Sequence, residues 1–456
     1  MEYFEYSQMR EKGREYFNSI DHNTALSKIM VQSMDSILNF SANSSENIKE
    51  YQLKKISQLV DYAYLNIPLY KKKYDEVGYK VGSIKSFSDF EKLPFLYKEE
   101  LIENFPHGIV KDLNSFMLST RSSGSSGKFV TLAVNLDAIY QDTLQGIRQF
   151  IKQSNGIYKK EDNVLFIYTC PWWIENISGE YRQSFLPTTC KFEDAIETIK
   201  QVKPVIISTY PTYLQGLCQY DIDLGKFGVK LVIVHSEQSS EQMRNEMSKK
   251  LNVEVLDEYS SEELTRIALE CPHKNYHLEE DACYIEIVDS KTKKKVADGT
   301  SGVVVGTNLL NNATPIIRYW QGDIASLATE KNCACGSNFR ILDHIQGRQM
   351  DCIISNKNII PASSFMDLAY NWYLEFKIPI HGMTYQIIQT ELKNIDILLQ
   401  KGLFRLSNDD IEKIKQSMYM LIDKSINVTV KFTDNFVYTS NKFKPVISLI
   451  NRGENG

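Results

Sequence analysis

Apolar runs of strand length alternate with stretches of helical spacing through the middle of the chain. The runs occupy residues 164–168, 205–209, 230–234 and 253–259. The helical stretches occupy residues 192–202, 213–220 and 239–251. Short continuous apolar runs are typical of strands buried on both faces, and strands that alternate with helices usually pair in parallel. The pattern predicts an α/β fold with a parallel sheet flanked by helices.

Different patterns lie on both sides of this region. Residues 51–77 follow a helical spacing that Pro68 interrupts, and residues 41–47 (SANSSEN) are polar enough for a loop. Residues 282–310 contain two strand patterns around a lysine-rich turn. That arrangement predicts an antiparallel hairpin, so the large sheet is expected to be mixed.

The end of the chain has the pattern of a smaller α+β unit. A strand pattern at 352–355 is followed by an amphipathic helix at 409–424 and a strand at 427–432. These elements suffice for a small domain of roughly a hundred residues. With the boundary at 347–351, the predicted domains are residues 1–347, of which 1–50 form a helical extension, and residues 348–456.

Charge and hydropathy exclude several classes of protein. The 456 residues include 52 basic and 57 acidic side chains, a net charge of -5, which gives no basic surface for nucleic acid or an anionic membrane. The apolar runs are far shorter than the ~20 residues that cross a bilayer. The first residues lack the apolar stretch of a secretory signal. We therefore expect a cytoplasmic protein with reduced cysteines.

A serine- and glycine-rich segment is the first candidate for chemistry. The sequence STRSSGSSGKFV has hydroxyl groups, glycines and a lysine close together, so its backbone N–H groups and side chains can surround a polyphosphate. The residues concerned are Ser122, Ser123, Gly124, Ser125, Ser126, Gly127 and Lys128. A solvated turn between two strands is the alternative interpretation.

Two further segments carry acidic residues near turns. In LDEYSSEEL, Tyr259 can offer an aromatic face to a base and Glu263 can offer a carboxylate to Mg²⁺. In RYWQGDIASL, Gly322 and Asp323 form a turn that can present a carboxylate to hydroxyl groups. Each segment also has an ordinary interpretation, an acidic helix start for the first and a common turn for the second.

Taken in order, these motifs resemble those of the acyl-adenylate-forming (AMP-binding) superfamily. Within it, they are most similar to the phenylacetate-CoA ligase family, including its branch associated with capsule biosynthesis. The resemblance runs from Tyr51 to Leu449 and leaves the first fifty residues unmatched. It implies the adenylate-forming fold, with a large N-terminal domain and a small mobile C-terminal lid domain. It also implies that ATP activates a carboxylic acid as its acyl-AMP.

The resemblance assigns the nucleotide side of the site. The residues from Ser122 to Lys128 match the segment that holds the β and γ phosphates of ATP. Ser236 and Glu237, in VHSEQ, match the loop beside adenine, and Tyr259 matches the residue that stacks on the base, with Ser260 next to it.

The resemblance also assigns the residues nearest to the reaction. Glu263 matches the ligand of Mg²⁺, Asp323 the ribose-binding carboxylate, and Arg348 a nucleotide contact near the domain hinge. Lys442, in YTSNKFKPVI, matches the lysine that bridges the carboxylate and the α-phosphate. A mobile ammonium can neutralise the charge that builds up during attack on phosphorus. A solvated lysine is the alternative for this position.

Four residues in two short clusters have the donor set of a metal site. Cys271 and His277 lie in ECPHKNYH, and Cys333 and Cys335 lie in NCACGSN. Three thiolates and one imidazole suit tetrahedral zinc in a closed, structural site. His273 is a rival ligand, and four unrelated residues are the other interpretation. The remaining cysteines, Cys170 among them, are predicted to be buried packing residues.

The acid-binding and acceptor regions depart from the resembled family. Aromatic walls are predicted from Trp172, Trp173, Tyr210, Pro211 and Tyr213, which favour a compact or flat carboxylate, although core packing explains them equally well. Met350 replaces an acidic hinge residue, residues 355–361 replace a glycine-containing loop, and Asn441 replaces a glycine. These changes make adenylation better supported than thioester formation.

The expected function is therefore activation of an aryl or small acyl acid to acyl-AMP. ATP and Mg²⁺, held through Glu263, would be needed, together with a structural Zn²⁺. The acyl group would pass to the thiol of CoA or of a carrier protein's phosphopantetheine, and a homodimer is left open. The alternatives are a non-thiol acceptor, giving an amide or an ester, and a catalytically silent nucleotide-binding partner.

Overall fold

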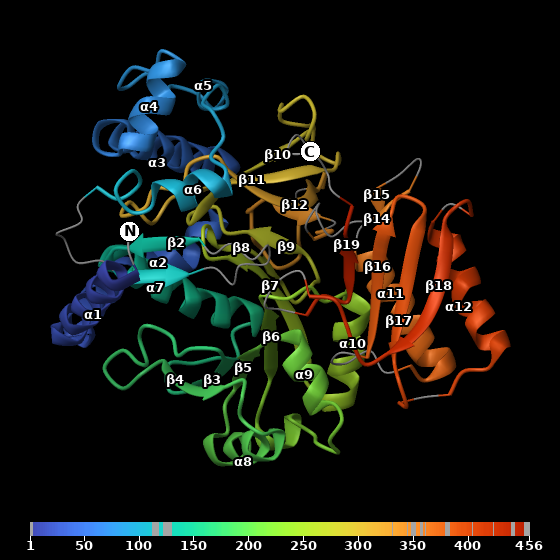
Figure 1. Cartoon of the computed structure of the whole chain (residues 1–456). Helices are drawn as coiled ribbons and strands as arrows, with labels where there is room; N and C mark the ends of the chain where they lie inside the picture. The colour runs from blue at the N-terminus through green and yellow to red at the C-terminus, as the bar shows by residue number, and fades with distance from the viewer. Residues whose placement is uncertain are drawn as a thin grey trace.

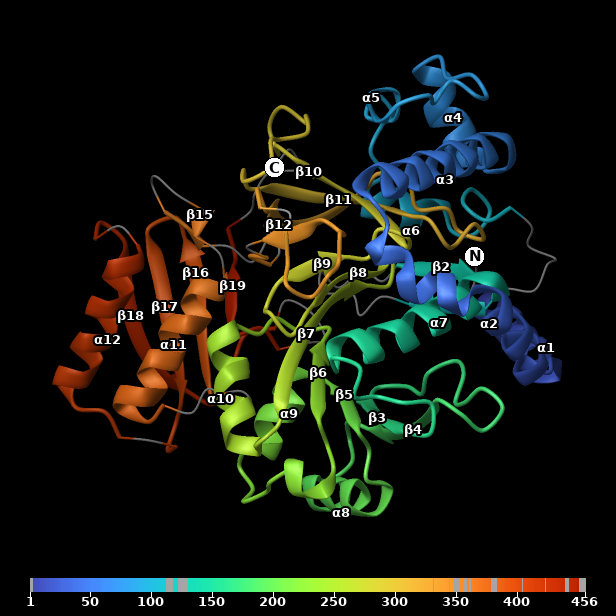
Figure 2. The same cartoon turned by 180° about the vertical axis from the view of Figure 1, so that it is seen from behind.

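The computed structural model describes most of the chain (Figures 1 and 2). The described residues are 3–111, 118–121, 130–330, 332–343, 345–347, 353–355, 359–360, 362–378, 384–403, 405–422, 424–438 and 443–450. The chain from α1 to β13 forms a large lobe built around one large sheet. The elements from β14 onwards form a separate lobe beside α10. None of the described helices is long and apolar enough to cross a membrane.

Half of the large sheet is parallel, as predicted. In sheet order, its strands are β4 (Arg182–Pro187), β3 (Asn163–Tyr168), β5 (Ile206–Thr209), β6 (Leu231–His235) and β7 (Glu254–Ser261). The connecting helices are α8 (Phe192–Val202), α9 (Pro211–Leu217) and α10 (Glu241–Leu251). Every position of β5 and β6 is buried, as continuous apolar runs require. The first strand of this set in sheet order, β4, has no such run and was not predicted.

Antiparallel strands complete the sheet on the far side of β7. They are β8 (Thr265–Glu270), β9 (Tyr276–Leu278), β13 (Ile341–Asp343), β12 (Tyr319–Leu327), β11 (Gly302–Asn308) and β10 (Cys283–Val288). The pairing of β10 with β11 is the hairpin expected from residues 282–310. A separate antiparallel pair consists of β1 (Leu118–Arg121) and β2 (Thr131–Val134). The predicted α/β class with a mixed sheet is confirmed.

Helices fill the chain before β1. They are α1 (Tyr3–Ser19), α2 (His22–Asn39), the 3₁₀ helix η1 (Phe40–Ala42), α3 (Ser45–Asn66), α4 (Pro68–Glu76), α5 (Phe87–Phe90) and α6 (Lys98–Asn104). Pro68 starts α4, where its missing N–H breaks no hydrogen bond. The loop expected at 41–47 is wrong for most of its length, because Ser44 accepts a hydrogen bond from the Asn47 amide and starts α3 there.

A long buried helix, α7 (Leu136–Gln153), joins the N-terminal helices to the sheet. Its Arg148 is 2% exposed and forms ion pairs with Glu279 and Asp281, which lie just before β10. The same guanidinium donates a hydrogen bond to the carbonyl of Ile37 in α2, at 3.2 Å. One buried cation therefore holds three separate parts of the chain together.

The C-terminal lobe has its own sheet and core. Its strands, in sheet order, are β18 (Asn427–Thr433), β17 (Asn394–Gln400), β16 (Tyr385–Glu391) and β19 (Val446–Ser448). Its other elements are β14 (Ile353–Ile354), β15 (Ile359–Ile360), α11 (Ala362–Phe376) and α12 (Asn408–Leu421). Trp372 is fully buried and donates a hydrogen bond to Ser417, which ties α11 to α12. Met243 of α10 packs into this core and links the two lobes.

The buried ion pairs of Arg148 predict a large loss of stability when the cation is removed. Arg148→Met leaves the carboxylates of Glu279 and Asp281 buried without their partner, which costs about 3–5 kcal/mol. Urea unfolding of the large lobe, followed by tryptophan fluorescence, measures this loss. Lys160→Ala is the matched control, because its pair with Glu180 is about half exposed, and it should cost less than about 1 kcal/mol. If Arg148→Met and Lys160→Ala lost the same free energy of unfolding, the stabilising role of the buried Arg148 ion pairs would be contradicted.

Candidate active site

A cavity of about 1260 Å³ opens at the carboxyl ends of the parallel strands. Tyr168 ends β3, Tyr210 follows β5, His235 ends β6 and Tyr259 lies near the end of β7, and all four line the cavity. Residues of the C-terminal lobe, from α11, β16 and the segment before β19, line it as well. In open α/β sheets this edge is the usual place for a ligand.

Tyr259 and Asp323 meet on one wall of the cavity. The Tyr259 hydroxyl, from β7, donates a hydrogen bond to the Asp323 carboxylate, from β12, at 2.6 Å. Asp323 is 7% exposed, and Gly322 before it has a φ of +84°, a conformation that glycine adopts without strain. The two residues predicted to contact the base and the ribose are therefore side by side.

A buried amide lies on the same cavity wall. The Nε2 of Gln238 has no hydrogen-bond partner among the described residues. Gly347 has a φ of +78°, a conformation that glycine adopts without strain, and a side chain there would also come within 2.8 Å of the Gln238 amide oxygen. An unsatisfied buried donor is costly, and a ligand acceptor in the cavity would satisfy it.

Ser236 and Glu237 lie at the turn after β6. Ser236 has a φ of +66°, which is unusual for a residue other than glycine, and its hydroxyl is 2.9 Å from Nδ1 of His235. The Glu237 carboxylate accepts hydrogen bonds from the amide and the hydroxyl of Thr212, at 3.2 and 2.7 Å. Both residues line the cavity with Ser260, and Glu237 also caps the start of α9.

Glu263 lies near the strands that flank the serine- and glycine-rich segment. It is 6% exposed, lines the cavity and accepts a hydrogen bond from the Tyr319 hydroxyl at 3.0 Å. The neighbouring Glu262 accepts a hydrogen bond from Thr120 at the end of β1. Arg121 of β1 pairs with Thr131 of β2. The residues from Ser122 to Lys128 lie outside the described part of the chain.

Arg348 and Lys442 also lie outside the described residues. Their described neighbours line the cavity, since Gly347 precedes Arg348, and Phe443 and Lys444 follow Lys442. The described chain therefore reaches the cavity at Gly347 and again at Phe443.

The predicted aromatic walls are partly present. Trp172 stacks on Phe166 with ring centroids 5.7 Å apart, and Trp172, Trp173, Tyr210 and Pro211 line the cavity. Tyr213 does not, because it lies two residues after Pro211 on α9 and packs against Phe192 in the core behind the sheet. Residues two apart on a helix lie on different faces.

Known proteins resemble this chain in sequence and in fold. No protein-family model matches the chain. The phenylacetate-coenzyme A ligase of Aromatoleum evansii is 28% identical over 335 residues, which cover 70% of this chain and 74% of that protein. The ligase of the same name from Pseudomonas putida is 25% identical over 334 residues, with coverage of 70% and 74%.

This similarity supports the resemblance to the adenylate-forming superfamily. The fold agrees, since a crystal structure of 2-hydroxyisobutyryl-CoA ligase in the postadenylation state, with 2-HIB-AMP, has a TM-score of 0.73. The two sequences are 18% identical, and the match covers 89% of this chain and 90% of the ligase chain. The resemblance to ligases of this superfamily is therefore confirmed, and the capsule-associated branch stays a prediction.

A buried polar cluster in this adenylate-forming ligase was not predicted from its sequence. Arg266 of β8 forms an ion pair with Asp142 of α7 and donates to Gln149 at 2.7 Å. Gln149 in turn donates to Glu258 of β7 at 2.7 Å, and all four side chains line the cavity. The guanidinium of Arg266 lies 5.3 Å from the ring centroid of Trp172. The cavity floor is therefore polar beneath its aromatic wall.

The protonation of this polar cluster follows from burial and from neighbouring charge. Burial raises the pKa of the Asp142 carboxyl, and the charge of Arg266 opposes the rise. Burial also acts to raise the pKa of Glu258, but the charges of Arg266 and His235 outweigh it and the pKa is lowered. Glu258 therefore stays ionised near neutral pH. The sequence gives no local signal for this cluster, because its members come from two segments, one in α7 and one at β7–β8, that are more than a hundred residues apart.

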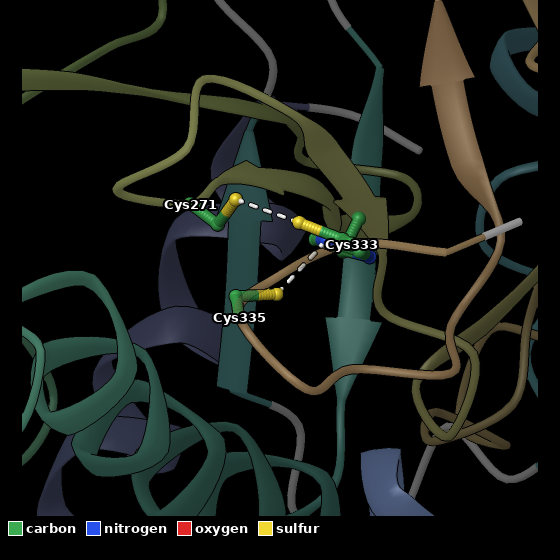
Figure 3. A group of neighbouring side chains, drawn as sticks. Cys271, Cys333 and Cys335 are labelled. Carbon is green, nitrogen blue, oxygen red and sulfur yellow. Dashed lines mark hydrogen bonds between the residues drawn. The ribbon is translucent and has the colours of Figure 1, made fainter. Parts of the chain in front are cut away.

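The four predicted metal ligands come together next to β8 and β9, and Figure 3 labels the three cysteines among them. Their donor atoms all lie within 4.8 Å of one another. The sulfurs of Cys271 and Cys333 are 3.7 Å apart, and Nε2 of His277 is 3.2 Å from the sulfur of Cys335. Two thiolates on one tetrahedral zinc lie about 3.8 Å apart, given Zn–S bonds of about 2.3 Å. The donor set and its spacing therefore fit zinc.

The surroundings of the cluster also suit a metal. Nδ1 of His277 is 3.1 Å from the Phe339 carbonyl, so it can donate there while Nε2 presents its lone pair to the cluster. Hydrogen bonds with Cys271 and His277 lower the pKa of the Cys335 thiol although burial opposes them, while the pKa of its partner Cys271 is raised. A thiolate is the form that binds a metal. His273, the rival ligand, is not part of the group.

The prediction that the remaining cysteines are buried is wrong for Cys170, and Cys190 and Cys218 are only partly buried against the core. Cys170 is exposed at the cavity, because it follows β3 on the loop that carries Trp172. Cys283, by contrast, is buried, as predicted.

Proposed function

We propose that this protein activates a carboxylic acid with ATP to form an acyl-AMP and pyrophosphate, and then transfers the acyl group to the thiol of CoA. The observation that carries the proposal is the shared cavity. The Tyr259–Asp323 pair lies in the same cavity as the aromatic wall around Trp172, and so does Gln238, whose Nε2 has no partner among the described residues. A nucleotide and an acid can therefore bind next to each other.

The nucleotide would bind along β7 and β12. The Tyr259 ring would stack on adenine, and its hydroxyl would hold Asp323 in place to accept hydrogen bonds from the ribose hydroxyls. The residues from Ser122 to Lys128, which connect β1 to β2, would surround the β and γ phosphates. Ser236, Glu237 and Ser260 would border the base. Mg²⁺ held by Glu263 would neutralise charge on the phosphates.

The acid would bind against Trp172, Trp173, Tyr210 and Pro211. A carboxylate oxygen would attack the α-phosphorus, and the bond from that phosphorus to pyrophosphate would break. Lys442 would contact the carboxylate and the α-phosphate, and Arg348 the nucleotide near the hinge. The position of Phe443 and Lys444 at the cavity supports the role of Lys442, because they follow it directly. The aromatic wall favours an aryl or small acyl group.

The acceptor of the acyl group is the less constrained part of the proposal. Curated relatives of this chain are named phenylacetate-coenzyme A ligases, which supports CoA. Met350 and Asn441 depart from the resembled pattern on the acceptor side, and this favours a second candidate, transfer to an amine or a hydroxyl group. Mass spectrometry of the products formed with CoA, and with simple amines in its place, separates the two.

The adenylation step predicts acid-dependent exchange of pyrophosphate into ATP. A panel of phenylacetate, benzoate and 2-hydroxyisobutyrate should reveal exchange in the wild-type protein. Lys442→Ala should lower its rate by a factor on the order of 10² to 10³, because a cation at the reacting phosphate is lost. Lys401→Ala, an exposed position in the same lobe, is the matched control and should leave the rate unchanged. Undiminished exchange in Lys442→Ala would refute the role of this lysine.

We also propose that Cys271, His277, Cys333 and Cys335 hold a structural zinc ion. Purified protein should contain about one zinc per chain, and the double variant Cys333→Ser/Cys335→Ser should lose it and melt at a lower temperature. Cys190→Ser/Cys218→Ser, outside the cluster, should keep both the zinc and the melting temperature. Metal analysis by mass spectrometry measures the content. The same zinc content in both double variants would rule out this site.

A further inference from the structure

The helical extension at the N-terminus contributes to the wall of the cavity. Arg14, Phe17 and Asn18, at the end of α1, line it together with Ala138 and Ile139 of α7. The Phe17 ring is half-buried and lies 5.6 Å from the ring centroid of Trp173. The part of the sequence without any match to the resembled family therefore reaches the proposed acid-binding end of the site.

The end of α1 is held in place by the first residue of α2. One ring nitrogen of His22 is 2.7 Å from the Phe17 carbonyl, and the other is 2.9 Å from the Tyr140 hydroxyl of α7. The rings of Phe17 and His22 are 3.9 Å apart. The Phe17 ring is therefore fixed between α7 and the loop that carries Trp173.

The loop between β3 and β4 carries Trp172 and Trp173, and we call it the tryptophan loop. It is itself attached to α2. The Ser178 amide donates a hydrogen bond to the Asn23 side chain at 2.9 Å, and the hydroxyls of Ser27 and Ser178 are 2.9 Å apart. Leu26 of α2 packs with Ile174 of the loop in one apolar cluster that also includes Phe17 and Trp173. The extension and the tryptophan loop thus form a single unit around one end of the cavity.

We infer that Phe17 is a specificity-determining residue, which closes the acid-binding end of the cavity and sets the length of the acid that fits. This inference rests on the proposed function, since it concerns the acid that is adenylated. An acyl group that lies along the Trp172–Trp173 wall and extends past Trp173 meets the Phe17 ring. Because Phe17 contacts neither Tyr259 nor Asp323 in the structure, its size should affect the choice of acid and leave ATP binding unchanged.

Two opposite substitutions test this inference. Phe17→Ala opens the end of the cavity and Phe17→Trp narrows it, so they should change acid preference in opposite directions. The probes are phenylacetate, 3-phenylpropionate and 4-phenylbutyrate, which differ by single methylenes, in the pyrophosphate exchange assay. One methylene in an apolar pocket changes kcat/KM by about 10- to 200-fold. Glu15→Ala, an exposed position on the same helix that does not line the cavity, is the matched control.

The expected result is a change in the ratio of kcat/KM for the longest and shortest acids. That ratio should rise by about tenfold or more in Phe17→Ala and fall by about tenfold in Phe17→Trp, with the KM for ATP constant. A purely structural role would lower kcat/KM for every acid alike and keep the wild-type ratio in both variants, which would overturn the inference. Wild-type protein without exchange for any acid would overturn the proposed function itself, and the inference with it.

Discussion

The fold and the candidate site both depend on α7, a largely buried helix whose Asp142 and Arg148 side chains both form ion pairs with distant parts of the chain. Arg148 pairs with Glu279 and Asp281, which fixes α7 against the hairpin half of the sheet. The next residue, Gln149, connects Arg266 and Glu258 beneath the cavity. An uncompensated buried charge costs several kcal/mol, so these partners leave the helix a single position against the sheet. The cavity lies between this helix and the carboxyl ends of the parallel strands, and its shape follows from that position.

The same helix links the N-terminal extension to the site. Tyr140 of α7 contacts His22, which in turn holds the end of α1. Ala138, Asp142 and Gln149 of the same helix line the cavity. The nucleotide wall, in contrast, is built from the sheet itself through Tyr259 and Asp323. This division suggests a physical reason why acid preference can change without loss of ATP binding, because the two walls belong to separate elements. The cluster of Cys271, His277, Cys333 and Cys335 lies at the other end of β8, where it joins the β8–β9 turn to the chain before β13.

The sequence predicted those elements whose physical cause is local. Continuous apolar runs marked β5 and β6, helical spacing marked α8 with its bounds, and short ligand spacing found the metal cluster. The sequence did not predict α7 or the polar cluster around Arg266, because the charged residues on the buried face of α7 meet partners more than a hundred positions away. Tyr213 failed to reach the cavity for a geometric reason, since the helical turn after Pro211 rotates it into the core. The residues from Ser122 to Lys128, Arg348 and Lys442 stay predictions, carried by the order of motifs alone.

The central claim is that the carboxylate of an acid attacks the α-phosphorus of ATP. Isotope transfer tests it most directly: the protein is incubated with ATP, Mg²⁺, CoA and an acid labelled with ¹⁸O in its carboxylate, and the nucleotide product is weighed by mass spectrometry. Adenylation places one carboxylate oxygen between the acyl carbon and phosphorus, and the acceptor then breaks the bond to the acyl carbon. AMP that carries one ¹⁸O atom is therefore the predicted product. Unlabelled AMP, or ADP with labelled phosphate, would contradict the account.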